Sequence, residues 1–469
     1  MKIPSGIPGL DEVLKGGLHK GWSYLVKGNP GTGKTIFGLQ FLLKGQKSVY
    51  ISFDQIFDEV KLQADNFGWD MSNIHFIDKV KEMDILSGNV LFYDYDSIVD
   101  IMELIQSITT LKELENVERV FIDGIGVLKD VTKDDSIYRR ILSSLVNFLN
   151  SIGATTVISA EMVNEVGKDI ISYLVSGEFV LRRVKRKDGR ILRTIEILKY
   201  RGGDAYLGEH YFTITDRGIV IHPIIPVFEG KHHTPDLLST GNPELDKMLG
   251  GGIYRGSRIY IAGKTGVGKT SLCLQILKEN DARGGIGILY AFEESRNAIL
   301  KKYKQIFNYE PEKLIIREVG DVSLGEFYNL VVQDLKLNPA MVAIDPLNAV
   351  DDLALSTDEF ISALNLLKRQ LEAVGATFIG TYEITQSVTE FHFTGARLSR
   401  FADYLIVGRH MEIEGELLKT LAVIKNRFGD HERTVRVLDI VDREGLKIGK
   451  PMKDFRGLMS GVIEKMEQS

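Results

Sequence analysis

Short apolar runs alternate with longer segments of helical periodicity in each half of the chain. Residues 48–53, 119–122 and 155–159 are rich in β-branched and aromatic side chains and are bounded by turn residues, which predicts strands. Between the last two runs, apolar side chains recur at helical spacing over residues 141–152. Strands that alternate with helices in this way predict an α/β fold with a parallel central sheet flanked by helices.

A β-hairpin is predicted at the edge of this sheet in the first half. The turn Lys187-Asp188-Gly189 is typical of a tight connection between two antiparallel strands. We therefore expect residues 179–184, 194–198 and 218–222 to be antiparallel additions to a mostly parallel sheet.

The chain also repeats itself at an offset of 235 positions. The matching residues are Gly6, Pro8, Leu10, Asp11, Leu14, Gly17, Gly21 and Gly28 in the first half and Gly241, Pro243, Leu245, Asp246, Leu249, Gly252, Gly256 and Gly263 in the second. Farther along the offset drifts, yet residues 152–155 still match residues 374–377, so insertions fall between shared elements. With a polar linker near residues 230–236, the repeat predicts two tandem domains of one fold, residues 1–230 and 231–469.

Each half carries a glycine-rich loop of the form GxxxxGK[ST] between an apolar strand and a helical segment. The two loops are Gly28-Asn29-Pro30-Gly31-Thr32-Gly33-Lys34-Thr35 and Gly263-Lys264-Thr265-Gly266-Val267-Gly268-Lys269-Thr270. In such a loop backbone N–H groups surround the β-phosphate, the lysine reaches the β- and γ-phosphates, and the threonine binds Mg²⁺. Two loops in register with a repeat predict that both halves bind ATP with Mg²⁺.

An aspartate ends an apolar strand at the matching place in each half. Asp123 follows residues 119–122, and Asp345 follows residues 341–344. A strand-end aspartate can be an ordinary turn former, but beside a phosphate loop it commonly completes the magnesium site. We expect Thr35 with Asp123, and Thr270 with Asp345, to hold the metal ion.

A hydrolase also needs a base that orients the attacking water. The second half offers Glu293 and Glu294 at the end of the strand after its loop, where the first half has Asp54 and Gln55. A shorter acid places its carboxylate differently, and a misplacement of about 1 Å can lower the rate on the order of a hundredfold. We therefore predict unequal halves, with hydrolysis in the second domain, against the alternative that the glutamate pair is a solvated strand end.

Composition narrows the choice of partners. The 469 residues are 44% hydrophobic and 26% charged with a net charge of −6, which is typical of a dissolved globular protein and does not favour nucleic acid. No run of 18 or more apolar residues appears, and the first residues lack the apolar core of a signal peptide. We expect a cytoplasmic protein without a membrane segment, in which the single cysteine, Cys273, is a buried thiol.

Beyond these motifs, the sequence resembles the KaiC family of RecA-like ATPases over nearly its whole length. The most specific stretches are residues 194–202 and 212–219. By resemblance, Lys199 and Arg201 in the first half, and Lys425 and Arg427 in the second, reach the γ-phosphate held by a neighbouring subunit. The resemblance also implies a homohexameric ring with ATP between subunits.

Circadian members of that family phosphorylate an adjacent Ser-Thr pair in the second domain. The matching stretch here, residues 393–403, keeps Ser399 but has Arg400 in place of the threonine. The resemblance therefore implies Ser399 as a candidate phosphate acceptor and departs from a two-site phosphorylation cycle.

Two other functions fit the same motifs. A RecA- or RadA-like DNA-dependent ATPase shares the core, but it would carry basic loops that the acidic composition does not favour. In a nucleotide-gated scaffold, ATP would hold subunits together and an unidentified regulatory protein would bind the ring, with little turnover. Asp54 and Gln55 favour the scaffold for the first half, whereas Glu293 and Glu294 favour hydrolysis in the second.

Overall fold

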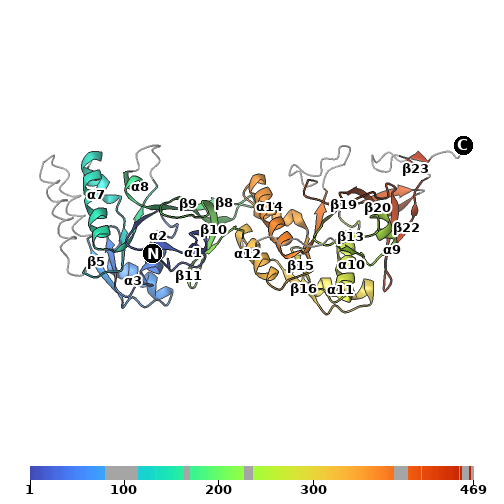
Figure 1. Cartoon of the computed structure of the whole chain (residues 1–469), viewed down its shortest axis with the longest axis horizontal. Coiled ribbons are helices and arrows are strands. Elements are labelled where there is room, and N and C mark those ends of the chain that lie inside the picture. The colour runs from blue at the N-terminus through green and yellow to red at the C-terminus, as the bar shows by residue number, and fades with distance from the viewer. Residues whose placement is uncertain are drawn as a thin grey trace. The chain divides into compact units, whose positions relative to one another are not determined.

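A computed structural model describes residues 1–79, 115–132, 134–162, 170–226, 236–384, 400–413, 415–453, 455–456 and 464–465. The chain divides into two compact units, Met1–Ile225 and Pro226–Ser469. Each unit contains one nine-stranded sheet with helices packed against it (Figure 1). The predicted α/β fold of two tandem P-loop domains is confirmed.

The sheet of the first unit is parallel over six strands and antiparallel at one edge. Across the sheet the order is β5-β4-β6-β7-β3-β8-β9-β10-β11. Its strands are β3 (Ser23–Gly28), β4 (Ser48–Ser52), β5 (Ile74–Asp78), β6 (Arg119–Asp123), β7 (Thr155–Ala160), β8 (Gly177–Lys185), β9 (Ile191–Tyr200), β10 (Gly208–Thr215) and β11 (Gly218–His222).

The second unit repeats this sheet strand for strand, in the order β16-β15-β17-β18-β14-β19-β20-β21-β22. Its strands are β14 (Arg258–Gly263), β15 (Gly287–Ala291), β16 (Leu314–Glu318), β17 (Met341–Asp345), β18 (Thr377–Glu383), β19 (Tyr404–Ile413), β20 (Glu416–Asn426), β21 (Arg436–Val441) and β22 (Gly445–Pro451). Short pairs flank the sheets: β1 (Lys2–Ile3) with β2 (Leu18–His19), β12 (Leu237–Leu238) with β13 (Ile253–Tyr254), and β23 (Phe455–Arg456) with β24 (Glu464–Lys465).

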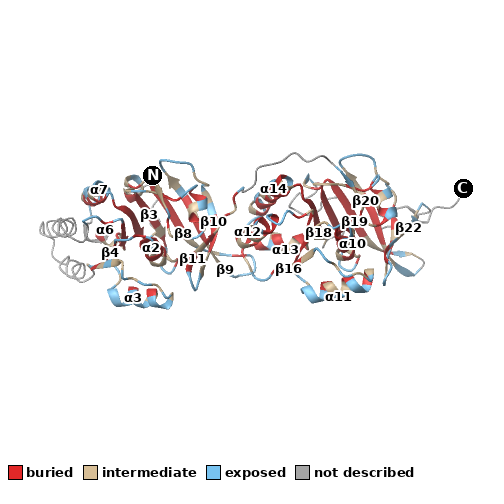
Figure 2. Cartoon of the chain, turned by 60° about the horizontal axis from the view of Figure 1, so that its bottom comes forward, coloured by how far each residue is buried: buried red, intermediate tan, exposed pale blue. Residues whose placement is uncertain are grey.

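Helices cover both faces of each sheet, so the central strands are buried (Figure 2). In the first unit, α1 (Leu10–Val13), α2 (Lys34–Leu42) and α3 (Phe57–Asn66) pack on one face, and α6 (Val127–Thr132), α7 (Asp135–Ser151) and α8 (Ile170–Leu174) pack on the other. In the second unit, α9 (Pro243–Met248), α10 (Lys269–Ala282) and α11 (Arg296–Phe307) share one core with the sheet. The remaining helices are α12 (Leu324–Leu335), α13 (Leu347–Leu353) and α14 (Thr357–Val374).

Local sequence explains where several of these helices begin and end. Asp134 caps α7 by accepting the Ser136 N–H at 2.7 Å. Ser323 and Glu326 form a reciprocal capping box at the start of α12. At the other end, Gly375 stops α14 in the left-handed conformation with φ 69°.

The repeated aspartate and glycine at the start of each domain have a structural purpose. Asp11 Oδ1 accepts the Ser5 N–H at 2.8 Å, and Asp246 Oδ1 accepts the Thr240 N–H at 2.7 Å. A Cβ on Gly17 would lie 2.2 Å from the Ile3 carbonyl oxygen, so only glycine fits there. These residues are therefore explained by packing of the amino-terminal segment of each domain.

One prediction about the sheet edge is partly wrong. Residues 179–184 lie in β8, which pairs in parallel with the phosphate-loop strand β3 and antiparallel only with β9. The hairpin turn at residues 187–189 fixes the direction of β8 relative to β9 alone. Its direction relative to the core strands depends on the crossover before it, which the hairpin pattern does not report.

Candidate nucleotide-binding sites

Each phosphate loop follows the central strand of its sheet and leads into a helix. The first loop connects β3 to α2, and the second connects β14 to α10. Gly33 and Gly268 precede the helices with φ values of 110° and 100°, a left-handed conformation that favours glycine. All sixteen predicted loop residues therefore lie where a strand end and a helix amino terminus can hold phosphate.

The loop lysines turn back onto their own loops. Lys34 Nζ donates to the Gly28 carbonyl at 2.7 Å, and Lys269 Nζ donates to the Gly263 carbonyl at 2.9 Å. Burial lowers the pKa of both lysines, and nearby carboxylates oppose that shift. The matching contacts place the two ammonium groups in equivalent positions.

In the first domain, three hydroxyl groups donate to Asp123. Thr35 Oγ1 and Tyr50 OH donate to Asp123 Oδ2 at 3.1 Å and 2.6 Å, and Ser159 Oγ donates to Asp123 Oδ1. Asp123 is buried, with 4% of its surface exposed. A threonine hydroxyl beside a carboxylate offers the oxygen ligands that Mg²⁺ prefers, so these residues fit the metal.

The second domain arranges the same positions differently. Thr381 Oγ1 donates to Asp345 Oδ1, as Ser159 does to its aspartate. Leu289 takes the place of Tyr50 in the strand register and has no hydroxyl to donate, while the next residue, Tyr290, donates to Asp334 Oδ2 at 2.9 Å. Arg317 holds Asp334 through two hydrogen bonds of 3.0 and 2.7 Å. Successive residues of a strand point to opposite faces of the sheet, so the Tyr290 hydroxyl contacts the ion pair of Arg317 and Asp334.

The two predicted glutamates have different surroundings. Glu294 forms an ion pair with Lys302 on α11. Glu293 interacts instead with the groups of the phosphate site: partial desolvation, Asp345 and Glu383 raise its pKa, and Lys269 opposes the shift. Of the pair, Glu293 is the carboxylate at the loop lysine.

Asp54 is the corresponding carboxylate of the first domain. Desolvation, Asp123 and Glu161 raise its pKa, and Lys34 lowers it. A Cβ on Gly124 would lie 2.6 Å from the Asp54 Cβ, so the turn after β6 packs directly against this residue. Asp54 therefore faces the site, with a side chain one methylene shorter than that of Glu293.

Sequence reasoning missed a second pair of carboxylates. Glu161 directly follows β7, and Glu383 ends β18, the strands that lie between the phosphate-loop strand and the aspartate strand. Both carboxylates interact electrostatically with the loop lysine of their domain. A hydroxyl residue followed two positions later by glutamate recurs in both halves, as Ser159 with Glu161 and Thr381 with Glu383, and this pattern could have found them.

The cations assigned by resemblance lie away from the phosphate loop of their own domain. Lys199 pairs across from Glu178 near the amino end of β8, whereas Gly28, at the start of the loop, is level with Leu181. Glu178 and Leu181 are three residues apart, or roughly 10 Å along a strand. Lys199 Nζ donates to the Ser172 and Val175 carbonyls, and Arg201 follows β9 as an exposed residue.

The second domain places its pair in the same way and adds an ion-pair network. Lys425 is opposite Leu405, at the end of the sheet away from the loop. Arg427 Nη1 lies 3.3 Å from Asp403 Oδ1, which also accepts Arg258 Nη2 at 2.8 Å. Asp403 is only 3% exposed and thus holds Arg427 from a buried position.

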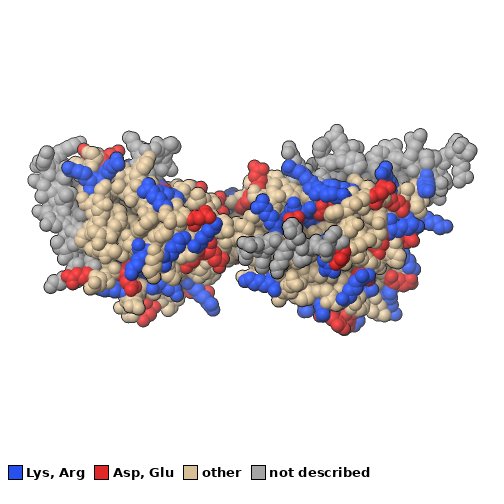
Figure 3. Space-filling view, in the orientation of Figure 1, with Lys and Arg blue, Asp and Glu red and all other residues tan. Residues whose placement is uncertain are grey.

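The candidate phosphate acceptor Ser399 lies outside the described residues. On the face in view in Figure 3, basic and acidic side chains are interspersed over both units. Within the described ranges, no helix is both long enough and apolar enough to cross a membrane.

Comparison with known proteins agrees with this geometry. The model of the KaiC ATPase family matches residues 3–225, 238–319 and 325–453. Circadian clock protein KaiC3 of Synechocystis sp. is 30% identical over 497 positions, which span 100% of this chain and 95% of that protein. Circadian clock oscillator protein KaiC of Synechococcus elongatus is 30% identical over 500 positions, spanning 100% and 94%. The chain therefore belongs to the KaiC family of ATPases, as the resemblance predicted.

Proposed function

We propose that both domains bind ATP with Mg²⁺ and that the second domain hydrolyses it, with Glu293 as the base. The observation that carries this proposal is that the two glutamates have different partners. Glu294 is paired with Lys302, while Glu293 shares the site with Lys269 and Asp345. Family membership supports the ATPase class of the reaction.

In the reaction, a water oxygen attacks the γ-phosphorus, the bond from the γ-phosphorus to the bridging oxygen of ADP breaks, and a water proton passes to Glu293. Lys269 holds the β- and γ-phosphates. Thr270 and Asp345 would hold Mg²⁺, which neutralises phosphate charge when bound. The raised pKa of Glu293 makes its carboxylate a better proton acceptor than an ordinary glutamate.

We also propose that Lys425 and Arg427 act on the nucleotide of a neighbouring copy, within a homohexameric ring, and that Lys199 and Arg201 do so in the first tier. Their position at the far end of the sheet from their own loop supports this role. Positive charge supplied from a second copy would couple hydrolysis to assembly.

The output we propose is regulatory rather than mechanical. Two relatives are named as circadian clock proteins, which supports a signalling role for this chain as well. The first domain would act as an ATP-bound clamp with slow turnover, since Asp54 replaces glutamate. Ser399 would accept phosphate from ATP in a weak autokinase reaction, and a regulatory protein would bind the ring.

The test is a comparison of Glu293→Gln with Glu294→Gln in the full chain. Glu293→Gln should lower turnover on the order of a hundredfold or more, the scale of a lost general base, with ATP binding retained. Glu294→Gln should change turnover less than about threefold, because Glu294 is held in a partly exposed ion pair with Lys302 and such pairs contribute little. Equal losses in the two variants would show that the pair acts jointly, and unchanged turnover in Glu293→Gln would overturn the proposal.

A further inference from the structure

A pocket in the second domain lies beside the first residue of β14, away from the phosphate loop. It has a volume of about 260 Å³ and is lined by Arg258, Ile361, Asn365, Lys368, Arg400 and Phe401. Arg258 begins β14 and the loop follows Gly263, so five residues, roughly 16 Å of strand, separate the two. The pocket is thus distinct from the nucleotide site of its own domain.

Three of the six lining residues are cations, and none of them is acidic. Arg258 Nη1 donates to Glu372 and Nη2 to Asp403, each at 2.8 Å. Lys368 lies 3.6 Å from the same Glu372 carboxylate. Glu372 and Asp403 therefore pair with two of the three lining cations, and Arg427 shares Asp403.

Arg258 also has one unpaired hydrogen-bond donor among the described residues. Its side chain is buried, and Nε is buried without a hydrogen-bond partner within the part of the chain that the structure describes. A buried donor left unpaired is unfavourable, and a charged guanidinium donor more so. An anion that reached this nitrogen would satisfy it.

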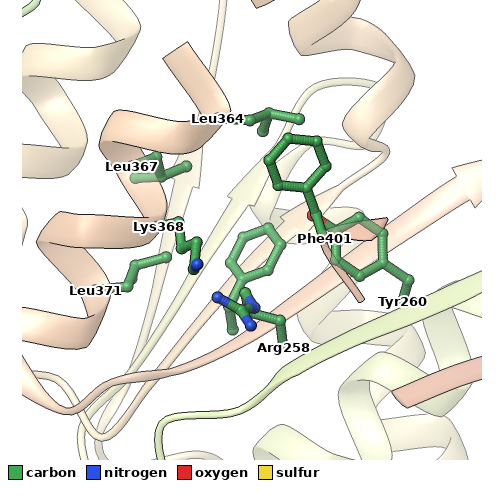
Figure 4. A pocket seen from close by; sticks show the side chains of 8 residues that line it. Arg258, Tyr260, Leu364, Leu367, Lys368, Leu371 and Phe401 are labelled. Carbon is green, nitrogen blue, oxygen red and sulfur yellow. The ribbon is translucent and has the colours of Figure 1, made fainter. Parts of the chain in front are cut away.

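The inner wall of the pocket is apolar and tightly packed. Figure 4 shows Leu364, Leu367, Lys368 and Leu371 directed from α14 toward Arg258, Tyr260 and Phe401. The space between them is only about 10 Å³, room for one water at most. A ligand would therefore occupy the outer part, with its charge on the cations and its body against Phe401.

We propose that this pocket binds a small phosphate-bearing anion. Guanidinium and ammonium groups together match a phosphate dianion better than a single carboxylate, because its charge and its oxygens are more numerous. The volume is just below the usual range for small-molecule sites, about 300–1,000 Å³, which suits inorganic phosphate or a small phosphate ester.

The experiment is calorimetric titration of the full chain with potassium phosphate at constant ionic strength, with both loops saturated by MgADP. The parent should bind one phosphate per chain at this pocket. Lys368→Gln combined with Arg400→Gln should weaken that binding at least tenfold. Arg369→Gln is the matched control, because it removes one charge from an exposed residue of the same helix that does not line the pocket.

Titration with phenyl phosphate separates the two sources of the phosphate group. Tighter binding of the ester than of inorganic phosphate would identify a phosphate ester that packs on Phe401, and equal binding would identify free phosphate. The proposal is wrong if acetate binds as tightly as phosphate, or if Arg369→Gln weakens binding as much as the double variant. Phosphate held beside ADP in the loop would leave the double variant unaffected, which would also overturn it.

Discussion

The two nucleotide sites share their strands and loops but differ around the magnesium-side aspartate. Asp123 accepts hydrogen bonds from Thr35, Tyr50 and Ser159 and is almost fully buried. In the second domain Leu289 occupies the position of Tyr50, and Asp345 is less buried. The two halves of the repeat therefore share the phosphate-binding frame and differ in the polar groups around the magnesium-side aspartate.

The two domains also differ in how they hold the arginine at the far end of the sheet. Asp403 anchors Arg427 in the second domain, and its counterpart at the start of β8 is Ser176, whose carbonyl accepts the Arg201 N–H at 2.8 Å. The backbone contact is retained, since Arg427 N donates to the Asp403 carbonyl at 2.9 Å. Among the residues that the structure describes, a carboxylate pairs with this guanidinium in the second domain alone.

The largest expected effect is the difference in turnover between variants of the two loop lysines. Lys269→Ala should lower steady-state turnover on the order of a hundredfold, the scale of a lost electrostatic contact to the transferring phosphate. Lys34→Ala should leave most turnover and instead weaken ATP-dependent assembly, measured by size-exclusion chromatography with and without ATP. If turnover falls with Lys34→Ala and survives Lys269→Ala, the first domain is the active one and Asp54 is a competent base.

A second prediction uses the pH dependence of turnover. Partial desolvation, together with neighbouring Asp345 and Glu383, raises the pKa of Glu293. Its carboxylate therefore becomes protonated, and inactive as a base, at a higher pH than an ordinary glutamate. Turnover should therefore fall about tenfold per pH unit below that raised pKa. Glu383→Gln removes one negative neighbour and should move this decline to lower pH. An unchanged profile in Glu383→Gln would remove Glu293 from the role of base.

Sequence patterns predicted those site residues whose positions are set by the local backbone. Glycines and a lysine at fixed spacing define the loop, and an acid that ends an apolar strand must lie at the carboxyl edge of the sheet. The direction of Glu294 could not be predicted, because its partner Lys302 is on the next helix. Nor could the contacts of Tyr50 and Tyr290, since each depends on a carboxylate distant in sequence. The buried pair of Arg258 and Asp403 is likewise a product of tertiary register.

A third prediction concerns the anchored arginine. Asp403→Asn keeps the shape of the side chain but removes the charge that holds Arg427, and it should lower kcat about tenfold with little change in KM for ATP. Glu372→Gln is the control, because Glu372 contacts Arg258 but is not paired with Arg427 within the described ranges. A loss of the same size in Glu372→Gln would mean that the network acts through stability alone.

The same variant tests whether Arg427 serves another copy. Mixed assemblies of Asp403→Asn and Glu293→Gln chains should regain part of the turnover, because one chain supplies the base and the other supplies the anchored arginine. If mixed assemblies of the expected size regain no turnover, both groups act in the same site.

The smallest expected effect is on magnesium affinity in the first domain. Burial and the Asp123 carboxylate keep the pKa of Tyr50 well above its usual range, so the hydroxyl stays protonated and donates to Oδ2. Tyr50→Phe removes one hydrogen bond from that oxygen, a change of about 0.5–1.5 kcal/mol, and should free it to interact with the metal. In the Lys269→Ala background, the Mg²⁺ concentration needed for ADP binding should fall about 2- to 10-fold. Tyr290→Phe in a Lys34→Ala background is the control, because that hydroxyl contacts Asp334, and it should change the concentration less than about twofold. Equal shifts in both variants would show that the hydrogen bond from Tyr50 does not control the metal.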